Sequence, residues 1–261
     1  MKKLLLVTAL GIVLSACSGG GGGGSSTSPA TPAKDNSQSN ANSESTAKGS
    51  LSSVRSDLQD QVKALKQVSV GGVVIDLASE NIGFVEKDLG GNIKGKAYNQ
   101  AYSAIGYALP KNVKTDQYGR VVDGRASVDD MGEFGLGTKF EDLPATGEYR
   151  YSGVSFGANS EGKLSLNVNF ADKTLSGAIT DRKLLSSGKE LFDINLLKTD
   201  IRRISQGGEE IHFAGVAKSN VDGYEVRSGY GGKFMGPNAE EVIGYVADDN
   251  ANPYEAFAGK R

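Results

Sequence analysis

Residues 148–170, EYRYSGVSFGANSEGKLSLNVNF, decide the fold of this chain. Apolar side chains occupy every second position from Leu164 to Phe170, and Ser165, Asn167 and Asn169 lie between them. Successive side chains of a strand point to opposite faces, so a period of two predicts a strand with one buried face. Glu148–Phe156 is predicted to form another strand just before it.

The same alternation continues toward the C-terminus. We expect a short turn at 171–173 and strands over Thr174–Ile179, 192–196, 211–213, 224–230 and 242–246. Strands in close succession without a long helix between them indicate an antiparallel sandwich or barrel. Seven or eight strands between about residue 147 and the end favour a small up-and-down barrel, whose closure removes the sheet edges.

The preceding part of the chain, residues 51–143, has weaker patterns. Apolar residues at spacings of three and four predict a short amphipathic helix over 51–65. Strands are expected over Val73–Leu77, Ile82–Glu86 and Ile93–Tyr98, bounded by glycine-rich turns. Strand pairing between Asp123 and Gly137, a stretch rich in glycine and acids, is left open.

The first 50 residues are interpreted as an export signal followed by a tether. Lys2, Lys3 and the apolar run 4–14 are typical of a signal peptide spanning 1–17, and the run is too short to cross a bilayer. Leu14-Ser15-Ala16-Cys17 looks like a bacterial lipobox, which implies that Cys17 carries acyl chains, palmitate among them. Residues 18–50, rich in Gly and Ser, lack the apolar side chains needed to offset the entropy of ordering, so we expect a disordered tether.

Composition excludes several classes of function. The chain has 261 residues, 36 Gly, 1 Cys, 1 His and a formal net charge of -2. Near-neutral charge gives no general attraction to nucleic acid, and one Cys excludes an intramolecular disulfide and a multi-Cys zinc site. No GxSxG elbow or phosphate-binding GxGxxG is present, so we expect neither catalysis nor a resident cofactor or metal.

The single histidine, His212, leaves two interpretations open. It lies between Ile211 and Phe213 in a predicted strand. A satisfied strand histidine is the simpler interpretation, and a haem axial ligand is the alternative.

A resemblance to a known family rests on several stretches. FEDLP at 140–144, YRYSGVSFG at 149–157 and GKLSLNVNF at 162–170 closely resemble the factor H-binding protein family of Gram-negative surface lipoproteins, as do GGK at 231–233 and EVIG at 241–244. YNQAYSA at 98–104 is similar to that family's N-terminal domain. Residues 229–246 also resemble the barrel ends of transferrin-binding lipoproteins.

This resemblance implies a mostly β protein with two domains. An open, curved antiparallel sheet would occupy 51–143, and an eight-stranded antiparallel barrel would occupy 144–261. The chain would be a monomer anchored by lipid in the outer membrane, facing the cell exterior, and would bind host complement factor H to evade complement. The alternative is capture of haem, haemoglobin or transferrin. Family members bind factor H partly through acidic barrel residues, which fall by position at Asp222 and at Ala247, with Asp248 beside it.

Overall fold

The computed structural model describes residues 49–70, 73–122, 131–206 and 209–261. All of them belong to one compact unit, Glu44–Arg261. The interpreted signal peptide with Cys17, and all but the last two residues of the interpreted tether, lie outside the described residues. The same is true of 123–130, within the stretch whose strand pairing the sequence leaves open.

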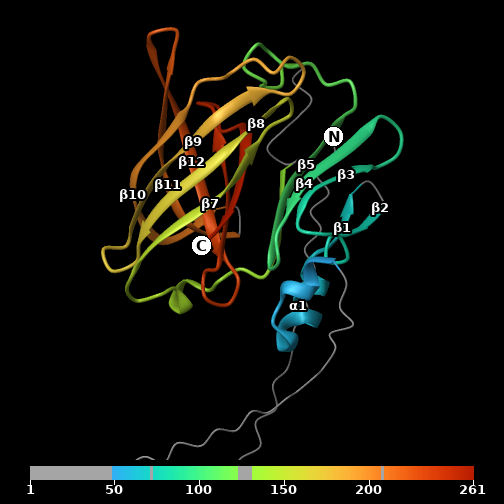
Figure 1. Ribbon diagram of the computed structural model, residues 1–261, viewed down its shortest axis with the longest axis vertical. Coiled ribbons are helices and arrows are strands. Elements are labelled where there is room, and N and C mark those ends of the chain that lie inside the picture. Colours follow the sequence, from blue (N-terminus) through green and yellow to red (C-terminus); the bar gives the residue numbers. More distant parts are fainter. Residues whose placement is uncertain (1–48, 71–72, 123–130, 207–208) are drawn as a thin grey trace, which may run out of the picture. The chain divides into compact units, whose positions relative to one another are not determined.

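The C-terminal part is a closed antiparallel barrel of eight strands, coloured yellow-green to red in Figure 1. Neighbouring strands follow chain order, and β14 pairs with β7 to close the barrel. This confirms the barrel. Its strands are β7 (Glu148–Phe156), β8 (Ser160–Asn169), β9 (Thr174–Leu184), β10 (Ile194–Gln206), β11 (Glu209–Val221), β12 (Tyr224–Met235), β13 (Glu241–Ala247) and β14 (Pro253–Lys260).

The alternating apolar side chains that predicted the barrel also fill its interior. Leu164, Leu166 and Val168 on β8 are at most 2% exposed and join one large core cluster with residues from the other strands. The turn expected at 171–173 joins β8 to β9, and Lys173 adopts the left-handed conformation there (φ 52°). The expected strand position of Phe192 is wrong, because β10 begins only at Ile194.

The N-terminal part has a four-stranded antiparallel sheet and a separate hairpin. The sheet consists of β3 (Gly83–Asp88), β4 (Ile93–Asn99), β5 (Ser103–Pro110) and β6 (Met131–Gly135) in that order. The hairpin pairs β1 (Gln67–Val70) with β2 (Val73–Asp76). A short 3-10 helix, η4 (Phe140–Asp142), precedes β7.

The continuous helix expected over 51–65 is wrong. The segment consists of η1 (Gly49–Ser53), η2 (Ser56–Leu58) and only two turns of α-helix, α1 (Gln59–Leu65). The Ser52 hydroxyl donates a hydrogen bond to the Gly49 carbonyl (2.8 Å), a local bond that competes with a regular helix. The apolar residues nevertheless reach a core, since Val62 is fully buried.

One face of the four-stranded sheet packs on the barrel. Ile105 of β5 shares a buried cluster with Phe156, Met235 and Ile243 of the barrel. The Lys96 ammonium, 7% exposed, lies 2.7 Å from a carboxylate oxygen of Glu161. This packing places the end of the sheet and the loop after it against particular barrel strands.

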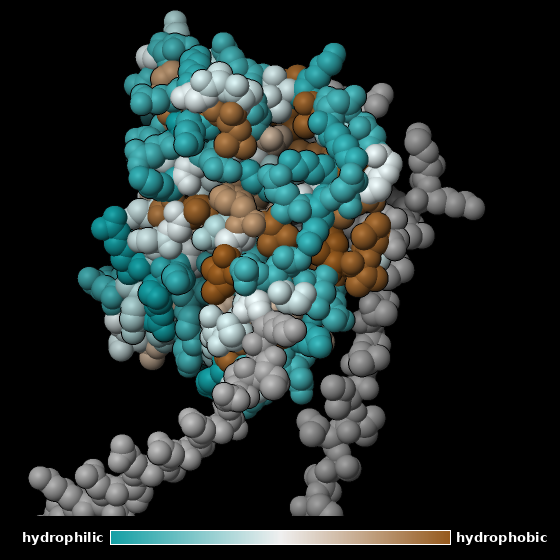
Figure 2. All heavy atoms as spheres, turned by 45° about the vertical axis from the view of Figure 1, so that its right-hand side comes forward, coloured by the Kyte–Doolittle hydropathy of each residue, from teal (hydrophilic) through white to brown (hydrophobic). Residues whose placement is uncertain are grey.

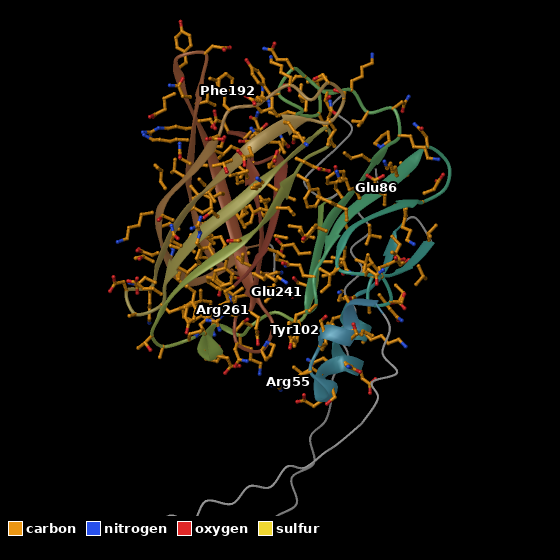
Figure 3. The ribbon with its side chains drawn as sticks, viewed as in Figure 1. Arg55, Glu86, Tyr102, Phe192, Glu241 and Arg261 are labelled. Carbon is orange, nitrogen blue, oxygen red and sulfur yellow. The ribbon has the colours of Figure 1, made fainter. Side chains whose placement is uncertain are left out.

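A buried carboxylate fixes the β4–β5 turn to the barrel. Glu241, at the start of β13, accepts hydrogen bonds from the backbone N–H groups of Ala101 (2.9 Å) and Tyr102 (3.1 Å) and from the Ser103 hydroxyl (2.7 Å). Figure 3 shows Glu241 and Tyr102 close to each other. Burial raises the pKa of Glu241, against the opposing effect of these donors.

Lys66 holds the opposite side of the same turn. Its ammonium donates to the carbonyl oxygen of Gln100 (2.7 Å) and to the Ser50 hydroxyl (2.8 Å), and the residue is fully buried. Burial lowers the pKa of Lys66 to about 8, while the carboxylate of Glu241 raises it. The turn is therefore held between the Lys66 ammonium on a carbonyl oxygen and the Glu241 carboxylate on two amides. We call this arrangement of Lys66, Glu241 and the β4–β5 turn the turn clamp.

Candidate partner-binding surface at one end of the barrel

Asp222 lies at the tip of the β11–β12 hairpin and is exposed. Asp222 and Gly223 both have positive φ (53° and 87°), as a type I′ two-residue hairpin turn requires. The Asp222 carboxylate lies 3.5 Å from the Tyr118 hydroxyl, a long contact that leaves it open to solvent. The expected acidic site on this loop is thus placed on a defined, outward hairpin tip.

Asp248 has a structural task in the β13–β14 loop. One carboxylate oxygen accepts hydrogen bonds from the backbone N–H groups of Asn250 and Asn252, both at 2.9 Å. The side chain is partly exposed, so it also presents charge to solvent. Ala247, the position implied by the resemblance, is only 6% exposed and ends β13. The acidic group that this loop presents is therefore that of Asp248 and its neighbour Asp249.

Two adjoining hollows connect the two acidic sites. A cavity of about 170 Å³ is lined by Asp248, Asp249 and Tyr254 among others, and a smaller one of about 120 Å³ by Asp222. Both share Tyr118 and Phe192 as walls. We call this end of the barrel the hairpin-end surface; Phe192 marks it near the top of Figure 3. The structure thus brings Asp222 and Asp248 to one surface.

Arg182, which lines the larger cavity, belongs to a buried ion pair. The Arg182 guanidinium lies 3.0 Å from a carboxylate oxygen of Glu255, and both side chains are at most 7% exposed. Arg182 also donates to the carbonyl of Phe192 (2.9 Å), and Glu255 accepts from the hydroxyls of Ser155 and Ser160. These bonds hold the loop that carries Phe192 against the barrel end.

Apolar and aromatic groups are exposed on the same hairpin. Tyr224 is 77% exposed and Val226 is 39% exposed, whereas most large apolar side chains of the barrel strands are buried. Exposed aromatic residues beside charged ones are typical of protein interfaces. The arrangement is suited to binding a macromolecule.

His212 lies away from this surface and is buried in β11. Its exposed fraction is 2%, and its Nδ1 accepts a hydrogen bond from the backbone N–H of Phe234 (3.1 Å). Its Nε2 lies 3.4 Å from a carboxylate oxygen of Glu210, and burial lowers the pKa of the ring. Both ring nitrogens therefore have a polar neighbour within the protein.

Sequence reasoning missed three parts of the surface. Tyr224 follows the Asp222-Gly223 turn directly, and that turn signal could have identified it as a hairpin tip. Tyr118 comes from the segment between β5 and β6, far away in sequence, and no local pattern links it to the barrel. The pairing of Arg182 with Glu255 joins residues 73 positions apart and has no sequence signal either.

Metal ligation and membrane crossing by a helix have no support within the described residues. No group of three or more His, Cys, Asp or Glu side chains there is arranged to hold a metal ion. None of the helices in the described ranges has the length and apolar character to cross a membrane.

Comparison with known proteins shows similarity over most of the barrel. Residues 141–246 match the family model described as factor H binding protein, C-terminal. This part of the chain is therefore similar to that family. The matched range includes β11 and β12 and therefore the Asp222 hairpin, and it ends just before Ala247 and Asp248.

Transferrin-binding proteins are also similar to this chain. Transferrin-binding protein B of Haemophilus influenzae is 30% identical over 145 residues, which cover 46% of this chain and 22% of that protein. The chain thus spans about a fifth of the length of this curated relative. The isotype 1 transferrin-binding protein B of Neisseria meningitidis shares the fold, with a TM-score of 0.50, 18% identity, and coverage of 76% of this chain and 39% of that one.

Proposed function

We propose that this protein is a lipid-anchored surface protein that binds host complement factor H through the hairpin-end surface. The match of residues 141–246 to the factor H binding protein family carries the proposal. The exposed Asp222 and Tyr224 on the hairpin tip support it, because an interface needs exposed anchors. Cys17 would supply the anchor, and residues 18–50 would separate the barrel from the membrane.

Charge and anchoring groups would have different tasks in this interface. Exposed carboxylates such as that of Asp222 steer the approach of a partner and fix its register, so they act mainly on the association rate. An aromatic side chain such as Tyr224 contributes to affinity when the partner buries it. We therefore expect Tyr224 to affect dissociation more than Asp222 does.

Transferrin is the second candidate partner. The similarity to a transferrin-binding protein of Haemophilus influenzae supports it, although the alignment covers only 22% of that protein. Both candidates are proteins, and the relatives' names describe binding proteins, so catalysis is not proposed.

Surface plasmon resonance with immobilised residues 44–261 tests the two candidates. Purified factor H and purified transferrin are passed over the same surface at up to micromolar concentration. We expect saturable binding of factor H and no binding of transferrin. Binding of transferrin alone would overturn the proposal in favour of the second candidate, and binding of neither would overturn both.

Two variants place the interface. Asp222→Asn removes the charge and keeps a side chain that tolerates the left-handed turn, so the hairpin should persist. We expect it to lower the association rate by about threefold and Tyr224→Ala to weaken affinity by about tenfold. Asp181→Asn is the matched control, since Asp181 also has a positive φ and an exposed side chain but lies on β9. An equal effect of Asp181→Asn would refute the placement.

A further inference from the structure

The N-terminal part contains an apolar cavity, partly open to solvent, that the proposed function does not use. It has a volume of about 400 Å³ and lies between the β1–β2 hairpin and the face of the four-stranded sheet that points away from the barrel. Val68 and Ile75 line it from the hairpin, and Val85, Leu89 and Phe134 line it from the sheet and its loops. Figure 2 shows hydrophobic side chains gathered on one face of the molecule.

The strand register explains why this space is not filled. One row across the sheet, starting at Val85, continues through Ala97, Gly106 and Gly132. The next row pairs Lys87 with Gly95 and Gly95 with Ala108. Two facing β-layers normally fill the space between them with interdigitating side chains. Here one layer contributes mostly glycine and alanine. Phe134 lies over Gly132 and Leu89 over Gly95, and a cavity remains between these side chains and the hairpin.

A cavity of this size and polarity is characteristic of a ligand site. Protein interiors are close-packed, and voids much larger than a water molecule are few. A dry apolar cavity of about 150 Å³ is enough to bind benzene, and ligand pockets begin at about 300 Å³.

A cation lies at the edge of this cavity. Lys87 lines it, on the same face as Val85, and its side chain is 44% exposed. Its ammonium contacts one carboxylate oxygen of Glu80 (2.5 Å), an exposed ion pair that can exchange partners at little cost. Apolar walls with one accessible cation at the edge complement a ligand with an apolar tail and one negative charge.

We propose that this cavity binds a fatty acid, with its tail between the β1–β2 hairpin and the small-residue rows of the sheet and its carboxylate at Lys87. Burial of the tail supplies most of the affinity, because each methylene group contributes about 0.8 kcal/mol. The site is independent of the hairpin-end surface.

Fluorescence of cis-parinaric acid, added to delipidated residues 44–261, tests the proposal. The probe becomes fluorescent on burial, and we expect saturation at one molecule per chain. Ala108→Leu extends a side chain from a cavity wall, so it should abolish the signal without lowering the melting temperature. Lack of saturable uptake by the wild type, or full uptake by a folded Ala108→Leu protein, would overturn the proposal.

A second pair of variants tests the carboxylate and does not depend on the folding of Ala108→Leu. Decanoic acid and the uncharged 1-decanol are compared as competitors of the probe. Lys87→Gln should weaken decanoic acid about fivefold, the upper range for an exposed ion pair, and leave 1-decanol unchanged. Lys94→Gln, which removes an exposed lysine paired with Glu86 outside the cavity, should change neither. Equal effects of Lys87→Gln on both competitors would overturn the assignment of the carboxylate to Lys87.

Discussion

Removal of the Glu241 carboxylate should weaken the attachment of the β4–β5 turn to the barrel more than any surface substitution. In Glu241→Ala, the N–H groups of Ala101 and Tyr102 lose their acceptor, and buried Lys66 loses the charge that stabilises its ammonium. An unsatisfied buried polar group costs about 1–3 kcal/mol, and breaking a buried charge arrangement costs about 3–5 kcal/mol. We expect the free energy of unfolding to fall by about 3–5 kcal/mol.

Urea denaturation of residues 44–261, followed by circular dichroism, measures this loss. Hydrogen exchange at the Ala101 and Tyr102 amides locates it, and both amides should exchange faster in the variant. Glu86→Ala is the control, since Glu86 forms an exposed ion pair with Lys94 and should cost less than about 1 kcal/mol. A loss in Glu241→Ala no larger than that of the control, with unchanged exchange, would refute the turn clamp.

Three further predictions concern the interior. The pKa of Lys66 is about 8 in the folded protein and 10.5 when free, so the folded state binds fewer protons between these values. The free energy of unfolding should therefore rise by about 2 kcal/mol between pH 7.5 and 9.5. Urea titrations of Lys66→Met should lack this rise. Glu255→Ala leaves the buried Arg182 charge without its partner, so the free energy of unfolding in the same urea denaturation should fall by about 3–5 kcal/mol. A loss below about 1 kcal/mol, as for an exposed pair, would contradict a buried ion pair. A Cβ at Gly232 would lie 2.3 Å from the Ile243 carbonyl oxygen, so Gly232→Ala should lower stability by about 1–3 kcal/mol, and an unchanged melting temperature would contradict this.

The barrel could be predicted from the sequence because its strands carry the information locally. Glu148–Phe156 was expected over the same residues that form β7, and the alternation from Leu164 to Phe170 identified the buried face of β8. The period of two does not depend on how the strands pack in detail, because each barrel strand buries one of its two faces. Strand ends were less predictable: β9 continues to Leu184, beyond the expected Ile179.

The N-terminal part was harder to predict because its structure depends on distant contacts. The apolar pattern over 51–65 correctly predicted that Val62 is buried. It did not predict the breaks between η1, η2 and α1. Lys66 and Glu241 look like ordinary surface residues in the sequence, yet they are buried on opposite sides of one turn. Such pairings become visible only once the strands are placed.

The candidate site was predictable in part. The resemblance pointed to the Asp222 turn and to the loop of Asp248, and the structure brings both loops to one end of the barrel. The walls they share, Tyr118 and Phe192, come from a segment outside the barrel and from a loop that was expected to be a strand. Neither position follows from periodicity.

Binding of factor H at the hairpin-end surface would protect the backbone there from hydrogen exchange. Hydrogen exchange of residues 44–261, measured with and without saturating factor H, tests it most directly. We predict slower exchange in the hairpin around Asp222 and Tyr224 and in the loop from Asp248 to Asn252. Unchanged exchange there, with protection confined to the opposite end of the barrel around Arg150 and Asn238, would contradict the claim.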